Sequence, residues 1–166
     1  FPEPHSVPAA PVPALGARAH VQGKAGKKTL GLDQLITGAY ETSLAVDELL
    51  VGVEIPLPAR SHRASYVKFQ LHERPTLGLA LVLGVEGDNI TEARAAVGSV
   101  SAIPSQSGEA NSLLAGSKAQ VEKQLADAAK VLAEAADPVD DLEGSAEYKR
   151  HLISVFLKRA FAQALS

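Results

Sequence analysis

The sequence predicts an α+β fold, and the order of its segments carries this prediction. Three strand-like segments follow one another with short turns between them, at 63–71, 76–85 and 90–100. Helical patterns then occupy the rest of the chain, at 108–116, 117–136 and 144–161. A run of strands followed by a run of helices is typical of an antiparallel sheet with one face covered. We therefore expect a three-stranded antiparallel sheet covered by three helices, in the order β-β-β-α-α-α.

Composition limits the class of protein. The 166 residues are enough for one domain with a real core, and 46% of them are hydrophobic. The net charge of −3 gives no reason to expect a nucleic acid or an anionic membrane as partner. No apolar run is long enough to span a bilayer and no signal peptide is visible, so we expect a cytoplasmic protein. Met is absent, even at position 1, which leaves open that the chain is a piece of a longer one.

The first 58 residues contain short elements. Five prolines in 1–13 predict an extended arm, because proline interrupts helices and central strands. Alternating apolar residues on either side of a glycine-rich turn predict a hairpin in 14–32. A short helix is expected at 32–38, ended by its glycine. The segment 47–58 reads as a strand that two prolines stop, and those prolines mark the expected domain boundary.

The second half contains the predicted sheet. In 63–71 polar and apolar residues alternate, which indicates a half-buried strand. The segment 76–85 is apolar almost throughout, which favours a central strand. Gly-Asp-Asn within 86–89 is a hairpin signal, and 90–100 returns as the third strand.

The first two predicted helices follow the sheet. Gly116 ends the short helix at 108–116, and Ser117 can cap the long helix that begins there. The apolar residues of this long helix share one stripe: Val121, Leu125, Ala128, Ala129 and Leu132.

The last helix has a clear start and a broad apolar surface. Ser145 can accept hydrogen bonds from the first free N–H groups, and Glu147 lies where the helix dipole favours a negative charge. The expected inner stripe is Tyr148, Leu152, Val155, Phe156 and Ala160. Leu157 and Phe161 point to a second side. Either they make a further contact outside the sheet, or the whole helix is a broad core-facing one.

Most catalytic motifs are absent from the sequence. Without cysteine there is no disulfide, no thiol nucleophile and no cysteine-held iron–sulfur cluster within the chain. The five histidines show no metal-binding spacing, so we expect no metal site. No glycine-rich phosphate loop and no GxSxG motif are present.

One charged cluster remains as a candidate site. The segment 66–76 joins the first two strands of the predicted sheet and gathers Lys68, His72, Glu73 and Arg74 before Pro75. Cationic groups at the edge of a sheet can hold an anionic or electron-rich ligand. An ordinary charged hairpin loop is the alternative interpretation.

Several segments together resemble a known family. "GSAEYKRHL" (144–152), "GAYETSLAVDELLVGVEIP" (38–56), "SYVKF" (65–69) and "ITEARAAVGSVSAIP" (90–104) resemble segments of the flavoprotein (medium) subunit of molybdenum hydroxylases. That family includes carbon monoxide dehydrogenase and xanthine dehydrogenase. The resemblance extends over about 14–166.

The resemblance implies a domain organisation and a function. Residues 1–58 would be the second half of an α+β FAD-binding domain, with the proline-rich arm, and 59–166 a carbon monoxide dehydrogenase flavoprotein-like C-terminal domain. The chain would be an oxidoreductase subunit, inactive alone, that binds FAD and passes electrons to an external acceptor. The electrons would come from [2Fe-2S] clusters on a small subunit and from a molybdopterin centre on a large subunit. A separate chain or segment would carry the N-terminal half of the FAD domain.

The resemblance also implies site residues. Leu44 matches a leucine that packs on the flavin, and Lys68 matches a strand lysine near the isoalloxazine ring. Pro75 and Thr76 fall where many relatives have an acidic residue and sometimes a tyrosine, and Arg74 would substitute there as a polar contact. No catalytic residue is expected. The alternative is a non-catalytic docking or scaffold domain that keeps the fold without binding flavin.

Overall fold

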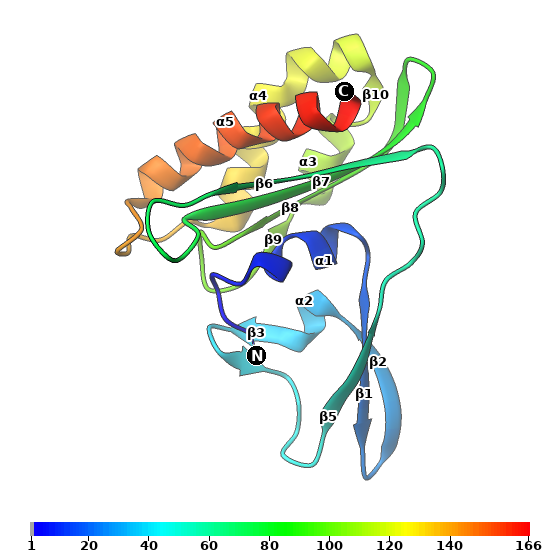
Figure 1. The fold of residues 1–166 in the computed structure, drawn as a ribbon, viewed down its shortest axis with the longest axis vertical. Coiled ribbons are helices and arrows are strands. Elements are labelled where there is room, and N and C mark those ends of the chain that lie inside the picture. The colour runs from blue at the N-terminus through cyan, green and yellow to red at the C-terminus, as the bar shows by residue number, and fades with distance from the viewer. Residues whose placement is uncertain (1) are drawn as a thin grey trace.

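The computed structural model describes residues 2–166 and shows two parts arranged along one long axis (Figure 1). The upper part is a sheet with helices against one face. Its strands are β6 (His62–Phe69), β7 (Leu77–Glu86), β8 (Asn89–Gly98), β9 (Ser105–Gln106) and β10 (Gly116–Ser117). Its helices are α3 (Gly108–Leu113), α4 (Lys118–Ala136) and α5 (Ala146–Leu165). This arrangement confirms the predicted α+β class.

The upper sheet is built around the predicted meander. β6, β7 and β8 pair antiparallel in sequence order, and Gly87 makes the turn between β7 and β8 with a φ of +59°. The short strands β9 and β10, which the sequence did not predict, both pair with β8. Two-residue strands carry no periodic signal, and this is why they escape sequence analysis.

The helices begin where their caps predict. The Ser117 hydroxyl accepts a hydrogen bond from the Gln120 amide at 3.3 Å, and the Ser145 hydroxyl accepts one from the Tyr148 amide at 3.2 Å. Each hydroxyl satisfies one of the free N–H groups at its helix start. In α4 the whole predicted stripe is buried. The sequence therefore predicted both the start and the buried face of this helix.

Helix α5 faces the core more broadly than its first stripe suggested. Leu157 and Phe161 are 0% and 4% exposed and lie in the same core cluster as the leucines of β7. Of the two interpretations, the broad core-facing helix is confirmed, and the further contact outside the core is wrong. Tyr148, expected inside, is 38% exposed and meets Phe69 edge to face. Because α5 packs on both the sheet and α4, two of its sides are buried.

A lysine is buried at the start of α5. Lys149 is 0% exposed, and its Nζ lies 2.6 Å from an Asp141 carboxylate oxygen and donates to the Val139 carbonyl at 2.9 Å. The amide of Ala146 donates to the Asp140 carboxylate at 2.6 Å. The loop before α5 is thus tied to the helix by one buried cation and by one bond from a helix amide to a loop carboxylate.

The proline-rich arm is helical, which corrects the prediction of an extended arm. It forms the 3₁₀ turn η1 (Val7–Ala9) and the short helix α1 (Pro11–Ala14). Proline is tolerated in a first helical turn, where its missing N–H is not needed. Ala10 and Ala14 pack against the sheet face opposite the helices, on the small residues Ala80, Val82 and Ala96. Figure 1 shows α1 below the sheet, across from α4 and α5.

The lower part is a small sheet in the order β2-β1-β5. Its strands are β1 (Arg18–Gly23), β2 (Gly26–Gly31) and β5 (Leu49–Glu54). The predicted hairpin and the predicted strand before the prolines are therefore confirmed. A second hairpin pairs β3 (Ile36–Gly38) with β4 (Glu41–Thr42). The expected helix at 32–38 is shorter than predicted, since α2 (Leu32–Leu35) ends where β3 begins.

Two kinds of feature are not found in the part of the chain that the structure describes. No helix within residues 2–166 is long and apolar enough to cross a membrane. In the same residues no group of three or more His, Asp or Glu side chains is placed to hold a metal ion.

The buried lysine generates a prediction about stability. We expect Lys149→Ala to lower the free energy of unfolding by about 3 kcal/mol, because it removes the partner of Asp141 and leaves a cavity. Lys149→Met fills the space without the charge and should lose about half as much, since the Asp141 side chain is 31% exposed and can hydrate. Urea titration followed by circular dichroism measures both variants.

The control for this prediction is Lys158→Ala. Lys158 lies on the same helix but is exposed, so its removal should change the free energy of unfolding by less than about 0.5 kcal/mol. If Lys149→Ala and Lys158→Ala are equally stable, the buried cation does not hold the loop.

Candidate functional site

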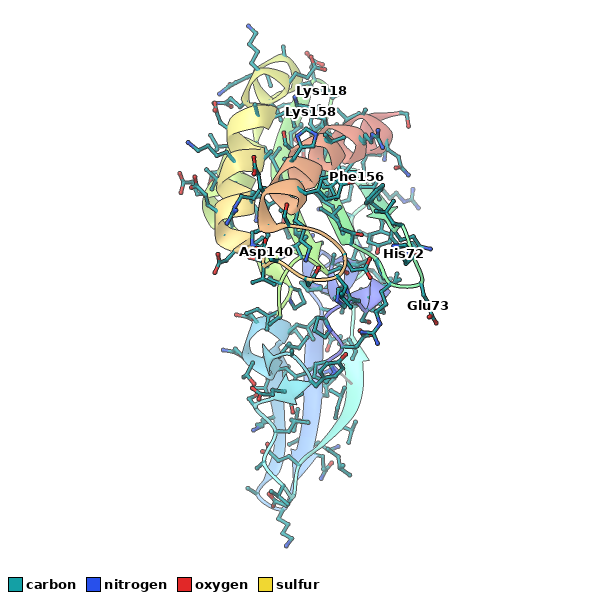
Figure 2. All side chains as sticks on the ribbon, turned by 90° about the vertical axis from the view of Figure 1, so that its left-hand side faces the viewer. His72, Glu73, Lys118, Asp140, Phe156 and Lys158 are labelled. Carbon is teal, nitrogen blue, oxygen red and sulfur yellow. The ribbon has the colours of Figure 1, made fainter. Side chains whose placement is uncertain are left out.

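Most of the predicted site residues lie at the turn between β6 and β7. Lys68 is near the end of β6, opposite Gly78 of β7, and its side chain is exposed. No hydrogen bond or ion pair joins its ammonium group to another described residue. His72 and Glu73 project away from the body of the molecule at the tip of the turn (Figure 2). Lys68 is therefore available to a ligand or partner.

The arm holds this turn from the other side. The Arg74 guanidinium is 3.5 Å from a Glu3 carboxylate oxygen, and the His5 ring donates from Nδ1 to the Pro75 carbonyl at 2.9 Å. The Thr76 amide donates to the Phe69 carbonyl at 2.9 Å and closes the turn. Arg74 thus has an ion-pair partner in a segment far away in sequence.

Two predicted site residues are buried. Pro75 and Thr76 are both shielded from solvent, and the Thr76 hydroxyl is 3.5 Å from a Glu143 carboxylate oxygen. Glu143 belongs to the loop before α5. Both side chains therefore face the interior of the upper part rather than its surface, and this geometry does not support flavin contact through either of them.

Leu44 lines a cavity in the lower part. The cavity has a volume of about 610 Å³, and its walls come from the arm, α2, β3, β5 and the loop after β8, which contributes Ala102 and Pro104. Its lining is mainly apolar and includes Leu35, Ile36, Leu44, Leu50, Val53 and Ile55. Glu3 and Tyr40 are among its polar neighbours. An apolar cavity with a few polar groups is the usual form of a site for a small organic ligand.

A carboxylate fixes the loop that presents Leu44. Glu48 accepts hydrogen bonds from the Lys28 ammonium at 2.8 Å and from the Ala45 amide at 2.9 Å. These two bonds, with the Lys28 one as the larger cause, hold the pKa of Glu48 below its ordinary value. The loop just after Leu44 is therefore tied to β2 by a charged group.

Glu3 joins the two halves of the candidate site. It lines the cavity that contains Leu44, and it also pairs with Arg74 at the turn. No contact joins Leu44 directly to Lys68 among the described residues. Sequence analysis did not identify Glu3, His5 and Glu48 as residues of the candidate site. An acidic residue between two prolines was visible, but the partners of these three side chains are set only by the fold.

The apolar and cationic groups of the candidate site fit one end of FAD. An apolar cavity wall suits an isoalloxazine ring, and the cationic Lys68 and Arg74 suit its electron-rich edge. The diphosphate end has no counterpart, because the sequence contains no glycine-rich phosphate loop. The residues present thus fit the ring of the cofactor, and they do not fit its phosphates.

Comparisons with known proteins identify relatives of this chain. The family model described as the CO dehydrogenase flavoprotein C-terminal domain matches residues 67–164. The nicotine 6-hydroxylase medium subunit of Paenarthrobacter nicotinovorans is 31% identical over 153 residues, which are 91% of this chain and 53% of that relative. The carbon monoxide dehydrogenase medium chain of Afipia carboxidovorans is also 31% identical, over 90% of this chain and 52% of that one.

Solved structures show the same fold. The crystal structure of the Cu,Mo-CO dehydrogenase superposes with a TM-score of 0.89 at 27% identity and covers 98% of this chain and 57% of that one. Quinoline 2-oxidoreductase from Pseudomonas putida 86 gives a TM-score of 0.85 at 26% identity, again over 98% of this chain and 57% of that one.

The chain spans about half the length of the curated relatives that it matches. Its match to the family model covers more than half of its residues, and the fold agrees throughout. The resemblance found in the sequence is thereby confirmed: this chain belongs to the family of medium flavoprotein subunits of molybdenum hydroxylases of the CO dehydrogenase type.

Proposed function

We propose that the chain is the C-terminal portion of a FAD-binding medium subunit in a molybdenum hydroxylase complex, where it takes part in electron transfer. The observation that carries the proposal is the cavity around Leu44, whose wall includes the same Glu3 that holds Arg74. Family membership and the relatives' names support the general class. The proposal places FAD between the cavity around Leu44 and the turn that carries Lys68 and Arg74.

In this proposal each residue has a physical task. When bound, FAD supplies the chemistry of accepting and passing on electrons, and the protein orients and tunes it. Leu44 packs against the ring and keeps water from one face. Lys68, which is exposed, adds a positive charge near the ring. Arg74 offers a second cationic contact whose direction Glu3 fixes.

The proposal includes partners and a location. A small subunit would carry [2Fe-2S] clusters and a large subunit the molybdopterin centre, so that electrons reach the flavin from the small subunit and leave to an external acceptor. Relatives of this chain are named as subunits or chains of such enzymes and complexes. The complex would work in the cytoplasm as an oxidoreductase, with this chain inactive alone.

A second candidate function is a docking or scaffold domain that binds no flavin. The burial of Pro75 and Thr76 and the absence of a phosphate loop favour it. In that case the cavity around Leu44 would be filled by protein side chains, and Lys68 and Arg74 would be surface charges.

The native assembly distinguishes these functions. We expect the assembly that contains this chain to show a flavin absorbance band, with one FAD released per chain on denaturation, because the cavity around Leu44 and the two cations would hold the ring. Absorbance spectroscopy and quantification of the released cofactor measure this. An assembly that contains the chain in full amount and no flavin would support the scaffold function and exclude electron transfer through FAD.

Lys68 should tune the flavin. In the native assembly we expect Lys68→Gln to lower the FAD reduction potential by about 30 mV, because removal of a nearby positive charge disfavours the more negative reduced form. Spectroelectrochemical titration measures the potential. Lys123→Gln, which removes a charge that is also exposed, on α4, serves as the matched control and should leave the potential unchanged. Equal potentials in both variants would place Lys68 away from the ring.

Glu48 should make the hold on the flavin sensitive to acid. Its folded pKa is lowered, so its bonds to Lys28 and Ala45 are fully present above the ordinary pKa and are lost as the pH falls through the lowered one. We expect the native assembly to release flavin faster in that acid range. Glu48→Gln should release it faster at neutral pH and lose this part of the pH dependence.

Flavin fluorescence after dilution measures this release. The control variant is Glu122→Gln, an exposed carboxylate on α4 that lies outside the cavity. If Glu48→Gln and Glu122→Gln release flavin at the same rate and with the same pH dependence, the loop after Leu44 does not hold the cofactor.

A further inference from the structure

The start of α5 and the loop before it contact both ends of the turn between β6 and β7. Phe69 ends β6, and its ring meets the Tyr148 ring edge to face, with 6.4 Å between the centroids. Thr76 stands just before β7, and its hydroxyl donates to a Glu143 carboxylate oxygen at 3.5 Å. The bond from the Thr76 amide to the Phe69 carbonyl joins the two ends. In Figure 1 the loop and the turn lie side by side at one end of the upper sheet.

Asp141 gives this loop its shape. One oxygen of its carboxylate accepts a bond from the Glu143 amide at 2.9 Å, and the other lies 2.6 Å from the Lys149 ammonium. The backbones of Asp141 and Gly144 bond to each other twice, at 3.2 Å each. Gly144 has a φ of +141°, and a Cβ added there would lie 2.9 Å from the Tyr148 ring. The segment 141–144 is thus a closed turn that fixes where the Glu143 side chain begins.

Lys149 is the fixed point of the loop. It is the only charged side chain of residues 2–166 that is fully buried, and it lies on the first turn of α5. Its ammonium also donates to the Val139 carbonyl at 2.9 Å. The Val139 amide in turn donates to the Val100 carbonyl just after β8. The ammonium therefore joins the loop, at two points, to a helix that is packed on the sheet.

A buried ion pair is a poor source of stability. The desolvation of two charges offsets most of their attraction, and an apolar side chain of similar volume often stabilises a fold as well. An ammonium differs from an apolar side chain in its three N–H donors, which require oxygen atoms around it. The lysine at position 149 therefore points to a role in placing the loop, beyond its part in stability.

The turn that the loop contacts carries both cations of the candidate site. Lys68 directly precedes Phe69, and Arg74 stands two residues before Thr76. Phe69 packs on the helix side of the sheet, 5.7 Å from the Phe156 ring. Neighbouring residues of a strand point to opposite faces, so the seat of Phe69 directs Lys68 to the side that carries the arm. The arm forms one wall of the cavity around Leu44.

We propose that Lys149 is a positioning residue for the candidate site. Through Asp141 and Glu143 it holds the two ends of the β6–β7 turn, and it thereby sets where the two cations of the turn lie. Lys149 does not itself line the cavity around Leu44. Loss of its ammonium loosens the turn and leaves the fold in place. The effect on the flavin rests on the proposed function, whereas the effect on the turn does not.

Hydrogen exchange of the native assembly tests the hold on the turn. We expect the Thr76 amide to exchange at least ~tenfold faster in Lys149→Met, because the turn can then open without breaking the ion pair. The Val85 amide donates to the Ser61 carbonyl at 3.0 Å, at the other end of the same pair of strands. It is the internal control and should exchange at an unchanged rate. Unchanged exchange at Thr76 overturns the proposal.

Two further variants separate positioning from a general loss of stability. Val121→Ala removes buried apolar volume at the start of α4, so it weakens the fold but should leave the exchange of Thr76 unchanged. Equal acceleration in Val121→Ala and Lys149→Met would overturn the proposal. Glu143→Ala removes only the acceptor of the Thr76 hydroxyl, at a partly exposed position, and should also accelerate the exchange. If Lys149→Met does not assemble, Glu143→Ala decides in the same way.

The flavin separates this inference from the proposed function. In an assembly that contains FAD, we expect Lys149→Met to lower the reduction potential by part of the shift that Lys68→Gln causes, because Lys68 loses its fixed place. The double variant should have the potential of Lys68→Gln alone, since the two residues act through one charge, whereas additive shifts would overturn the positioning role.

The remaining outcomes assign a failure to one proposal or the other. An assembly without flavin, in which Lys149→Met still loosens the turn, would overturn the proposed function and leave the hold on the turn intact. A flavin-containing assembly in which Lys149→Met leaves the potential unchanged would do the reverse.

Discussion

The burial of β7 on both faces is the constraint on which the rest of the structure depends. Leu77, Leu79, Leu81 and Leu83 alternate toward the helices, and the residues between them face the arm. A strand that is apolar on both faces has to be covered twice. The two covers differ in thickness: long helices pack on the leucines, while the short helix α1 approaches the small residues of the other face. The turn η1 just before α1 lies equally close to the neighbouring strand β8, since a Cβ added to Gly98 would lie 3.2 Å from the Cβ of Ala9.

The position of the arm links this constraint to the candidate site. Because α1 is fixed on the sheet, the residues before it are brought to the turn between β6 and β7, where His5 and Glu3 bind. The same residues form one wall of the cavity around Leu44. The packing of Ala10 and Ala14 on the upper sheet therefore helps to place Glu3 at the cavity and beside Arg74. The site belongs to neither part alone.

The sequence predicted the elements with strong periodicity and failed where contacts distant in sequence decide. The strands of the meander, both long helices and their serine caps follow from local pattern. The prediction of an extended arm was wrong. It rested on the density of prolines, although proline also suits a first helical turn. Leu157 and Phe161 are buried because α4 covers a second side of α5.

The candidate site was predictable to a smaller extent. Lys68 and Arg74 stood out as part of a charged cluster, because charged residues can be recognised from the sequence alone. Leu44 has no polar group in its side chain and was proposed only through family resemblance. The burial of Thr76 depends on Glu143, which is 67 residues away. The order of synthesis adds a consequence for the arm: it leaves the ribosome before β8, and its seat on that strand exists only once Ala96 has followed. The arm therefore waits, and His5 and Glu3 can reach the turn only late in folding.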